Sequence, residues 1–170
     1  MISKENQSGL NAPSSPVHAP FKLPDLTLLR HRLDLEMSTT LHEDLVADHE
    51  QMLGIMRRAR LALLLGDIAQ ARESLGALHE LQQAHIAHEE GALIPRLPAS
   101  ARWAAKVYLA EHGKLSAMLT EWRHALSTLP SRLSDGEERL ALLDATLPLQ
   151  HLLEHHFERE EKGLFVDIQV

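Results

Sequence analysis

The sequence predicts an all-α protein with an up-down-up-down antiparallel four-helix bundle. After Pro24 the chain is rich in Leu, Ala, Glu, Arg and Gln at helical spacing and poor in β-branched residues. No segment shows the alternation of apolar and polar residues that indicates a strand. Helix-breaking residues come at long intervals, so we expect four long helices joined by short connections.

The chain should divide into a flexible N-terminal arm, residues 1–24, and the bundle, residues 25–170. The arm holds four of the eight prolines among small polar residues, a composition that neither sustains a helix nor buries an apolar face. A short extra helix is expected over residues 25–36, with Asp25 as its cap. The 170 residues, 44% of them hydrophobic, are enough for one core.

The first two long helices are placed by their end signals. Ser38, Thr39 and Thr40 offer an N-cap for the first helix, which should run to about residue 65. Gly66 and Asp67 then form a stop and a restart. The second helix should cover residues 67–95.

The third helix should begin after the turn between Pro95 and Pro98, with Ser100 as its cap, and reach about residue 129. Ser134 or Asp135 should cap the fourth helix, which is expected to end near residue 163. Proline inside this last helix, at position 148, removes one backbone donor and should kink it.

Composition excludes several functions. A net charge of −7 with scattered basic residues offers no basic stripe for nucleic acid. The chain has no cysteine, which rules out disulfides, iron–sulfur ligation and zinc-finger sites, so any metal must use nitrogen and oxygen ligands. No segment reads as a signal peptide or a membrane span, and we expect a cytoplasmic location.

Two segments share the pattern HxxxEExxL followed by a large apolar residue. One starts with His85 and Glu89, and the other with His156 and Glu160. On a helix, residues i and i+4 lie about 40° apart and about 6 Å along the axis, so each pair can point at one common atom. With 12 histidines in a glutamate-rich chain, about one HxxxE pair is expected by chance, so the motif alone is weak.

A second repeat makes the pattern much more specific. The tripeptide ADH ending at His49 resembles AEH ending at His112, and each lies one helix before an HxxxE pair. His49 lies 17 residues before Gly66 and His85 lies 19 after it, so antiparallel helices bring both to one level. The other turns give similar offsets. We therefore expect six side chains to converge at one level of the bundle: His49, His85, Glu89, His112, His156 and Glu160.

These motifs resemble the hemerythrin-like, or HHE cation-binding, domain family over roughly residues 40–166. The resemblance implies two non-haem iron ions, with an oxo or hydroxo bridge between them as an option. By position it implies that the four histidines are terminal nitrogen ligands and that Glu89 and Glu160 bridge the ions. Imidazole and carboxylate suit iron or manganese.

The chain departs from the oxygen-carrying hemerythrins, in which the third helix supplies a second histidine and the last helix places an aspartate after its histidine. Here position 116 is serine. One iron should therefore have fewer protein ligands, which argues against simple reversible oxygen carriage. Tyr108, one turn before His112, is a candidate additional ligand, although a tyrosine packed in the core is the simpler interpretation.

The leading functional hypothesis is a di-iron protein that binds or senses dioxygen or nitric oxide at an open iron position. One alternative is an enzyme that turns over peroxide or nitric oxide, and we leave open whether the protein is an enzyme. Another is an iron donor for the repair of iron centres, but those proteins usually carry a cysteine-containing N-terminal domain. We expect neither nucleic acid nor membrane as partner. A sensor would signal through a homo-oligomer or another partner, with the N-terminal arm as a candidate contact.

Other residues have simpler interpretations. Glu90 and Glu161 should be solvated or should contact the metal ligands from outside. His42 should be a cap or surface residue. The remaining histidines flank the motifs or follow no pattern, namely His18, His31, His79, His88, His124, His151 and His155. The sequence contains no HExxH and a single ExxH, so zincin and ferritin-like sites are unsupported.

Overall fold

The computed structural model describes residues 26–168, with side chains from residue 43 onward, and this part of the chain forms four helical arms without strands. The elements in chain order are α1 (Leu26–Leu64), α2 (Ile68–His88), η1 (Glu89–Leu93), η2 (Ile94–Arg96), α3 (Ala105–Ser127), α4 (Gly136–Ala145), α5 (Leu147–Arg159), η3 (Glu160–Leu164) and α6 (Phe165–Asp167). The predicted flexible N-terminal segment, residues 1–24, lies outside the described residues.

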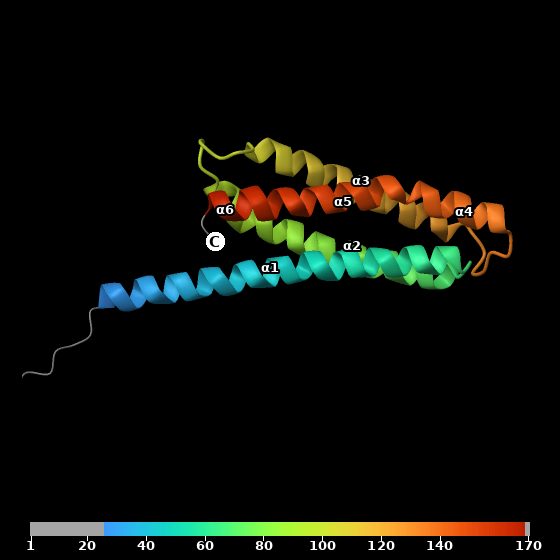
Figure 1. The fold of residues 1–170 in the computed structure, drawn as a ribbon, viewed down its shortest axis with the longest axis horizontal. Helices are drawn as coiled ribbons and strands as arrows, with labels where there is room; N and C mark the ends of the chain where they lie inside the picture. Colours follow the sequence, from blue (N-terminus) through green and yellow to red (C-terminus); the bar gives the residue numbers. More distant parts are fainter. Residues whose placement is uncertain (1–25, 169–170) are drawn as a thin grey trace, which may run out of the picture.

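The four arms run up and down along one long axis, as Figure 1 shows. α1 is the first arm, α2 the second, α3 the third, and α4 with α5 the fourth; α1 packs beside α2 and also beside α4 and α5. This arrangement confirms the predicted all-α four-helix bundle. Among the described helices, none combines the length and the apolar composition needed to cross a bilayer.

The first turn is where the sequence placed it. Gly66 has φ 71°, a left-handed conformation that glycine adopts without strain, and a Cβ at this position would lie 2.1 Å from the Leu133 carbonyl oxygen. The Asp67 side chain then caps α2 by accepting a hydrogen bond from the Gln70 backbone amide (3.1 Å). Gly66 therefore acts through its backbone conformation and Asp67 through its side chain, and both signals can be recognised in the sequence.

The prediction of two separate helices in the first arm of the bundle is wrong. A short helix over residues 25–36 and a new start at Ser38–Thr40 were expected, but α1 is one continuous helix of 39 residues. Serine and threonine cost little inside a helix, and no glycine or proline lies between Leu26 and Gly54 to break it. At 1.5 Å per residue α1 is about 58 Å long, and its N-terminal part projects past the other arms (Figure 1).

The third arm begins later than predicted. The Ala101 amide donates to the Pro98 carbonyl oxygen (3.0 Å), and the Arg102 amide donates to the Asp167 carboxylate (2.8 Å). These bonds hold residues 97–104 in a turn against the C-terminal end of the fourth arm. Ala104 is extended, with ψ 148°, so the helix starts at residue 105 and Ser100 does not cap it.

The fourth arm is interrupted as its proline predicts. The Asp135 side chain caps α4 by accepting from the Glu138 amide (2.8 Å). α4 ends at residue 145, and α5 begins at Leu147 with Pro148 in its first turn, where the missing backbone donor is tolerated. The arm continues beyond the predicted end near residue 163, through η3 into α6.

Two hydrophobic clusters fill the bundle, one on each side of a buried polar layer. The larger cluster includes Met52, Met56, Leu115, Leu119 and Phe157. The smaller cluster, toward the C-terminal end, comprises Leu45, Leu93, Ile94, Tyr108, Leu164, Phe165 and Ile168. The polar layer between them is therefore shielded from water on both sides.

Candidate metal centre

All six predicted side chains meet in the buried layer. His49 comes from α1, His85 from the last turn of α2, and His112 from α3. His156 lies in the last turn of α5, and each glutamate opens the π-helical turn that follows its histidine. None of the six residues is more than 2% exposed, namely His49, His85, Glu89, His112, His156 and Glu160. The six therefore share one desolvated layer between the arms.

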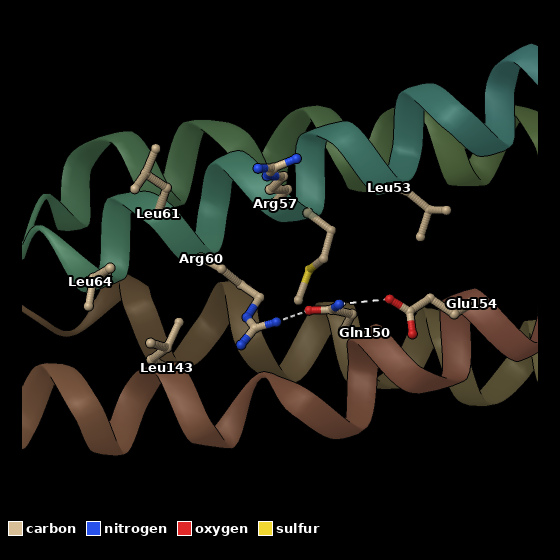
Figure 2. A pocket seen from close by; sticks show the side chains of 9 residues that line it. Leu53, Arg57, Arg60, Leu61, Leu64, Leu143, Gln150 and Glu154 are labelled. Atoms are coloured by element: carbon tan, nitrogen blue, oxygen red, sulfur yellow. Dashed lines mark hydrogen bonds between the residues drawn. The ribbon is translucent and has the colours of Figure 1, made fainter.

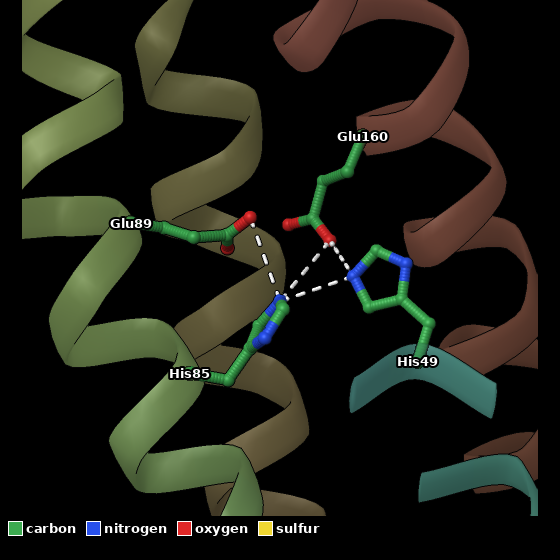
Figure 3. Close-up of side chains that lie close together, drawn as sticks. All are labelled: His49, His85, Glu89 and Glu160. Carbon is green, nitrogen blue, oxygen red and sulfur yellow. Dashed lines mark hydrogen bonds and ion pairs between the residues drawn. The ribbon is translucent and has the colours of Figure 1, made fainter. Parts of the chain in front are cut away.

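The histidines form two pairs, His49 with His85 and His112 with His156. Each glutamate directs one carboxylate oxygen toward each pair. Glu160 Oε2 lies 3.2 Å from His49 Nε2 and 3.9 Å from His85 Nε2. Its Oε1 lies 3.2 Å from His112 Nε2 and 2.8 Å from His156 Nε2. Figure 3 shows this carboxylate above the first pair. One carboxylate thus faces both pairs at once.

Glu89 is placed in the same way. Its Oε1 lies 3.5 Å from His85 Nε2, and its Oε2 lies 3.2 Å from His112 Nε2. The donor atoms form two groups that share both glutamates, His49, His85, Glu89 and Glu160 in one and Glu89, His112, His156 and Glu160 in the other. Within each group all donor atoms lie within 4.8 Å of one another, which is compatible with a common cation.

Every imidazole is also held from outside by a carboxylate on a neighbouring arm. The outer nitrogen Nδ1 faces the carboxylate in all four cases, at 2.9 to 3.3 Å. The pairs are His49 with Glu161, His85 with Asp48, His112 with Glu90, and His156 with Glu111. In a neutral ring, Nδ1–H donates outward, so the lone pair of Nε2 points into the layer.

The outer carboxylates follow the internal repeat of the sequence. Asp48 and Glu111 directly precede His49 and His112, and each contacts the histidine of the next arm. The two remaining outer carboxylates directly follow the HxxxE glutamates, as predicted for residues that contact the ligands from outside. The roles of Asp48 and Glu111 were missed, although their place in the repeated tripeptides was the available signal.

One outer pair differs from the other three. Glu111 is also bound by the Arg159 guanidinium, and its side chain is only 18% exposed. The other three carboxylates are 35% to 42% exposed and form no ion pair with a lysine or arginine among the described residues. His156 is therefore oriented by a carboxylate that is more buried than the other three and is itself bound by an arginine.

Each HxxxE glutamate begins a π-helical turn, η1 or η3. π-helical turns are rare and concentrate at functional sites. The wider turn in the second arm and its counterpart in the fourth place Glu89 and Glu160 at the same depth of the bundle. This local geometry is not apparent from the spacing of the motif.

The polar groups of the layer satisfy one another poorly, which is what a cation site requires. Both oxygens of Glu89 and Oε2 of Glu160 are buried without a hydrogen bond of good geometry. His49 Nε2 and His85 Nε2 face each other at 3.0 Å, so at least one must carry a proton there. A cation between these nitrogens and oxygens would satisfy all of them.

Without a cation, protons hold the layer together. Burial opposes protonation of His85, but hydrogen bonds with Glu160 and Glu89 raise its pKa to about 10. His112 likewise loses solvation, and bonds with Glu160, Glu89 and Glu90 raise its pKa to about 10. Burial would raise the pKa of Glu160, but the four histidines lower it well below its usual range. Cation binding must therefore displace protons.

Tyr108 is fully buried beside this layer. Loss of solvation, with the negative charges of Asp167 and Glu160, raises the pKa of its phenol to about 12. The positive charge of Arg159 and the Leu164 backbone partly oppose this rise in pKa, but the hydroxyl completes no hydrogen bond of good geometry. A Cβ on Gly163 would lie 2.8 Å from the phenol oxygen, so the absence of a side chain there makes room for the ring.

Ser116 and three further histidines lie outside the buried layer. Ser116 accepts a hydrogen bond from the Gln83 side chain (3.1 Å) at the surface and lies outside both donor groups. His88, His151 and His155 are exposed, and the side chains of His18, His31 and His42 lie outside the described part. Phe157, which no motif singled out, stacks on the His49 ring with centroids 4.2 Å apart.

Fold and site together define an all-α four-helix bundle with a buried His/Glu cluster that is compatible with metal binding. A model of the hemerythrin HHE cation binding domain matches residues 40–168. The chain therefore belongs to the hemerythrin HHE cation-binding family, as its motifs predicted. No match was found among curated proteins or among solved structures.

Proposed function

We propose that this protein holds two non-haem iron ions and binds or senses a small oxidant, dioxygen or nitric oxide. The observation that carries the proposal is the splitting of both carboxylates between two histidine pairs. Glu160 approaches all four histidines, and Glu89 approaches one of each pair. Carboxylates with one oxygen toward each of two sites are the arrangement that bridges two cations.

The donor types support iron. Two imidazoles and two carboxylates at each position match the nitrogen and oxygen ligands of non-haem iron, and manganese is the main competitor. In the proposed assignment, His49 and His85 hold one ion, His112 and His156 hold the other, and Glu89 with Glu160 bridges them. Iron in this setting supplies an exchangeable coordination position and a change of oxidation state.

The surroundings support a small, uncharged ligand. Each donor group contains four protein residues, which leaves positions open if the ion is octahedral. Ser116 supplies no further ligand, and the apolar clusters on both sides disfavour large or charged molecules. Phe157 and Phe165 lie against His49 and exclude water from this side of the centre.

Anaerobic titration of the iron-loaded protein with dioxygen, nitric oxide or peroxide tests the proposal. A stable, reversible optical adduct with one of the first two supports binding or sensing. Repeated turnover of peroxide or nitric oxide would instead make the protein an enzyme. Release of iron on exposure would support iron delivery. Failure to form any adduct would contradict the proposed function.

Tyr108 is proposed as a candidate additional ligand. Its phenol has a raised pKa and stays protonated near neutral pH, so ligation requires that iron displaces its proton. A bound phenolate gives ferric iron a visible charge-transfer band, which Tyr108→Phe would abolish while iron content stays unchanged. Identical optical spectra of the two ferric proteins would leave Tyr108 as a packed core residue.

A further inference from the structure

Exposed leucines gather at one end of the bundle. Leu61, Leu64 and Leu65 on the last turns of α1 and Leu140 on α4 are between 49% and 63% exposed. Single exposed apolar residues are common on soluble proteins, but clustered ones indicate a surface that another molecule covers. Leu109, on α3, is a comparable exposed leucine outside this cluster.

α4 is only partly buried against its own chain. Its ten residues include Leu140, Leu142 and Leu143, yet none of its residues is buried. Most other helices of the described part bury residues along their inner face. Leu142 packs partly against the larger hydrophobic cluster, whereas Leu140 is 49% exposed and Leu143 lines a groove, so the burial of these two leucines is incomplete in one chain.

A groove of about 580 Å³ separates α1 from α4 and α5. Figure 2 shows Leu64 opposite Leu143 at one end and Leu53 opposite Glu154 at the other. We call this surface, lined by Leu53, Met56, Arg57, Arg60, Leu61, Leu64, Leu143, Gln150 and Glu154, the α1–α5 groove. Its walls are mostly apolar, so its exposure to water is costly.

The two walls of the α1–α5 groove carry opposite charges. Arg57 and Arg60 lie on α1, whereas Glu154 lies on α5. Arg60 donates to the Gln150 side chain, and Gln150 in turn donates to Glu154 (2.7 Å). Arg57 forms no ion pair among the described residues, so the basic wall retains an unmatched charge.

We propose that the α1–α5 groove is a two-fold interface with a second copy of this chain. A two-fold axis along the groove lays α1 of one copy over α4 and α5 of the other. Leu61 and Leu64 then meet the second copy's Leu143, and Arg57, one turn along α1 from Leu53, lies within about one helical turn of the second copy's Glu154, which its long side chain can reach. The surface is self-complementary in both apolar character and charge, as an isologous dimer requires.

Sedimentation equilibrium of the full-length, metal-loaded protein tests the interface. The proposal predicts a concentration-dependent mass that approaches two chains of 19.1 kDa. The double variant Leu61→Asp, Leu64→Asp should raise the dimer dissociation constant at least about tenfold, because it buries unpaired charge in the contact. Leu109→Asp, a matched change on α3, should leave the constant unchanged.

A charge exchange separates an interface from a folding defect. Arg57→Glu alone and Glu154→Arg alone place like charges across the axis, and each should weaken the dimer. The double variant carrying both changes restores opposite charges and should return the dissociation constant to near the wild-type value.

Three results would overturn the proposal. The first is a wild type that stays monomeric at all concentrations, which would leave the groove to a different occupant. The second is a dimer that the paired leucine variant does not weaken. The third is a charge-exchanged double variant as weak as the single variants. None of these readouts depends on the identity of the oxidant or of the metal.

Discussion

Removal of the outer carboxylates one at a time should weaken metal binding by unequal amounts. Each outer carboxylate fixes the tautomer and the orientation of one imidazole, and loss of such a partner typically costs about 10–100-fold in metal affinity. This range corresponds to about 1.4–2.8 kcal/mol per site. The structure ranks the four positions within it.

Glu111 should have the largest effect and Asp48 the smallest. Glu111 is 18% exposed, lies 3.1 Å from His156 Nδ1, and also binds Arg159, so Glu111→Gln disturbs two partners. We expect a loss near the upper end, about 100-fold. Asp48 is 35% exposed and lies 3.3 Å from His85 Nδ1. Its contact is longer and better solvated, so Asp48→Asn should cost about tenfold or less.

Competition with a chromophoric chelator, performed on the full chain, measures these affinities. Glu158→Gln is the matched control, because Glu158 lies on α5 and is 53% exposed but pairs with Lys162 and not with the cluster. Circular dichroism should show the same helix content for all variants. The reasoning is refuted if Glu158→Gln weakens binding as much as Glu111→Gln, or if Asp48→Asn has the larger effect.

Gly163→Ala should lower the free energy of unfolding by about 1–3 kcal/mol, because its Cβ would lie 2.4 Å from the Trp103 ring. Gly113→Ala, with nothing within 4 Å of its Cβ, should raise the free energy of unfolding by about 0.5–1 kcal/mol. Equal urea midpoints for the two variants would contradict the tight packing at Gly163. Loading metal near pH 7.5 should release at least two protons per chain, because His85 and His112 have pKa values of about 10 without metal. Calorimetry in buffers of different ionisation enthalpy counts them, and release near zero would refute this. The raised pKa values of His85 and His112 should stabilise the metal-free protein fully below about pH 6.5. This contribution to the free energy of unfolding should be lost as the pH rises through about 10.

The bundle was predictable because its turns depend on residues with special backbone properties. Gly66 provides a left-handed turn and Pro148 an interruption, and both effects are local to the chain. The continuity of α1 was not predictable in the same way. Serine and threonine fit both a helix cap and a helix interior, so Ser38–Thr40 alone could not distinguish a break from a continuous helix.

The convergence of the six central residues could also be predicted, because antiparallel helices of known rise bring residues at equal distances from a turn to one level. The outer partners depend on side-chain directions between neighbouring arms. Glu161 meets His49 across 112 positions of sequence. The motif named Glu161 as a candidate outer contact, but spacing along one helix could not identify His49 as its partner. The two π-helical turns were hidden for a similar reason, since hydrogen-bond register is set by tertiary packing.

Metal content after iron reconstitution tests the central claim most directly. The proposed centre predicts two irons per chain for the wild type, measured by elemental analysis after removal of unbound metal. The double variant Glu89→Ala, Glu160→Ala removes both shared carboxylates and should retain almost none. Fewer than about one iron per wild-type chain, or unchanged iron in the double variant, would contradict a di-iron centre built on these two glutamates.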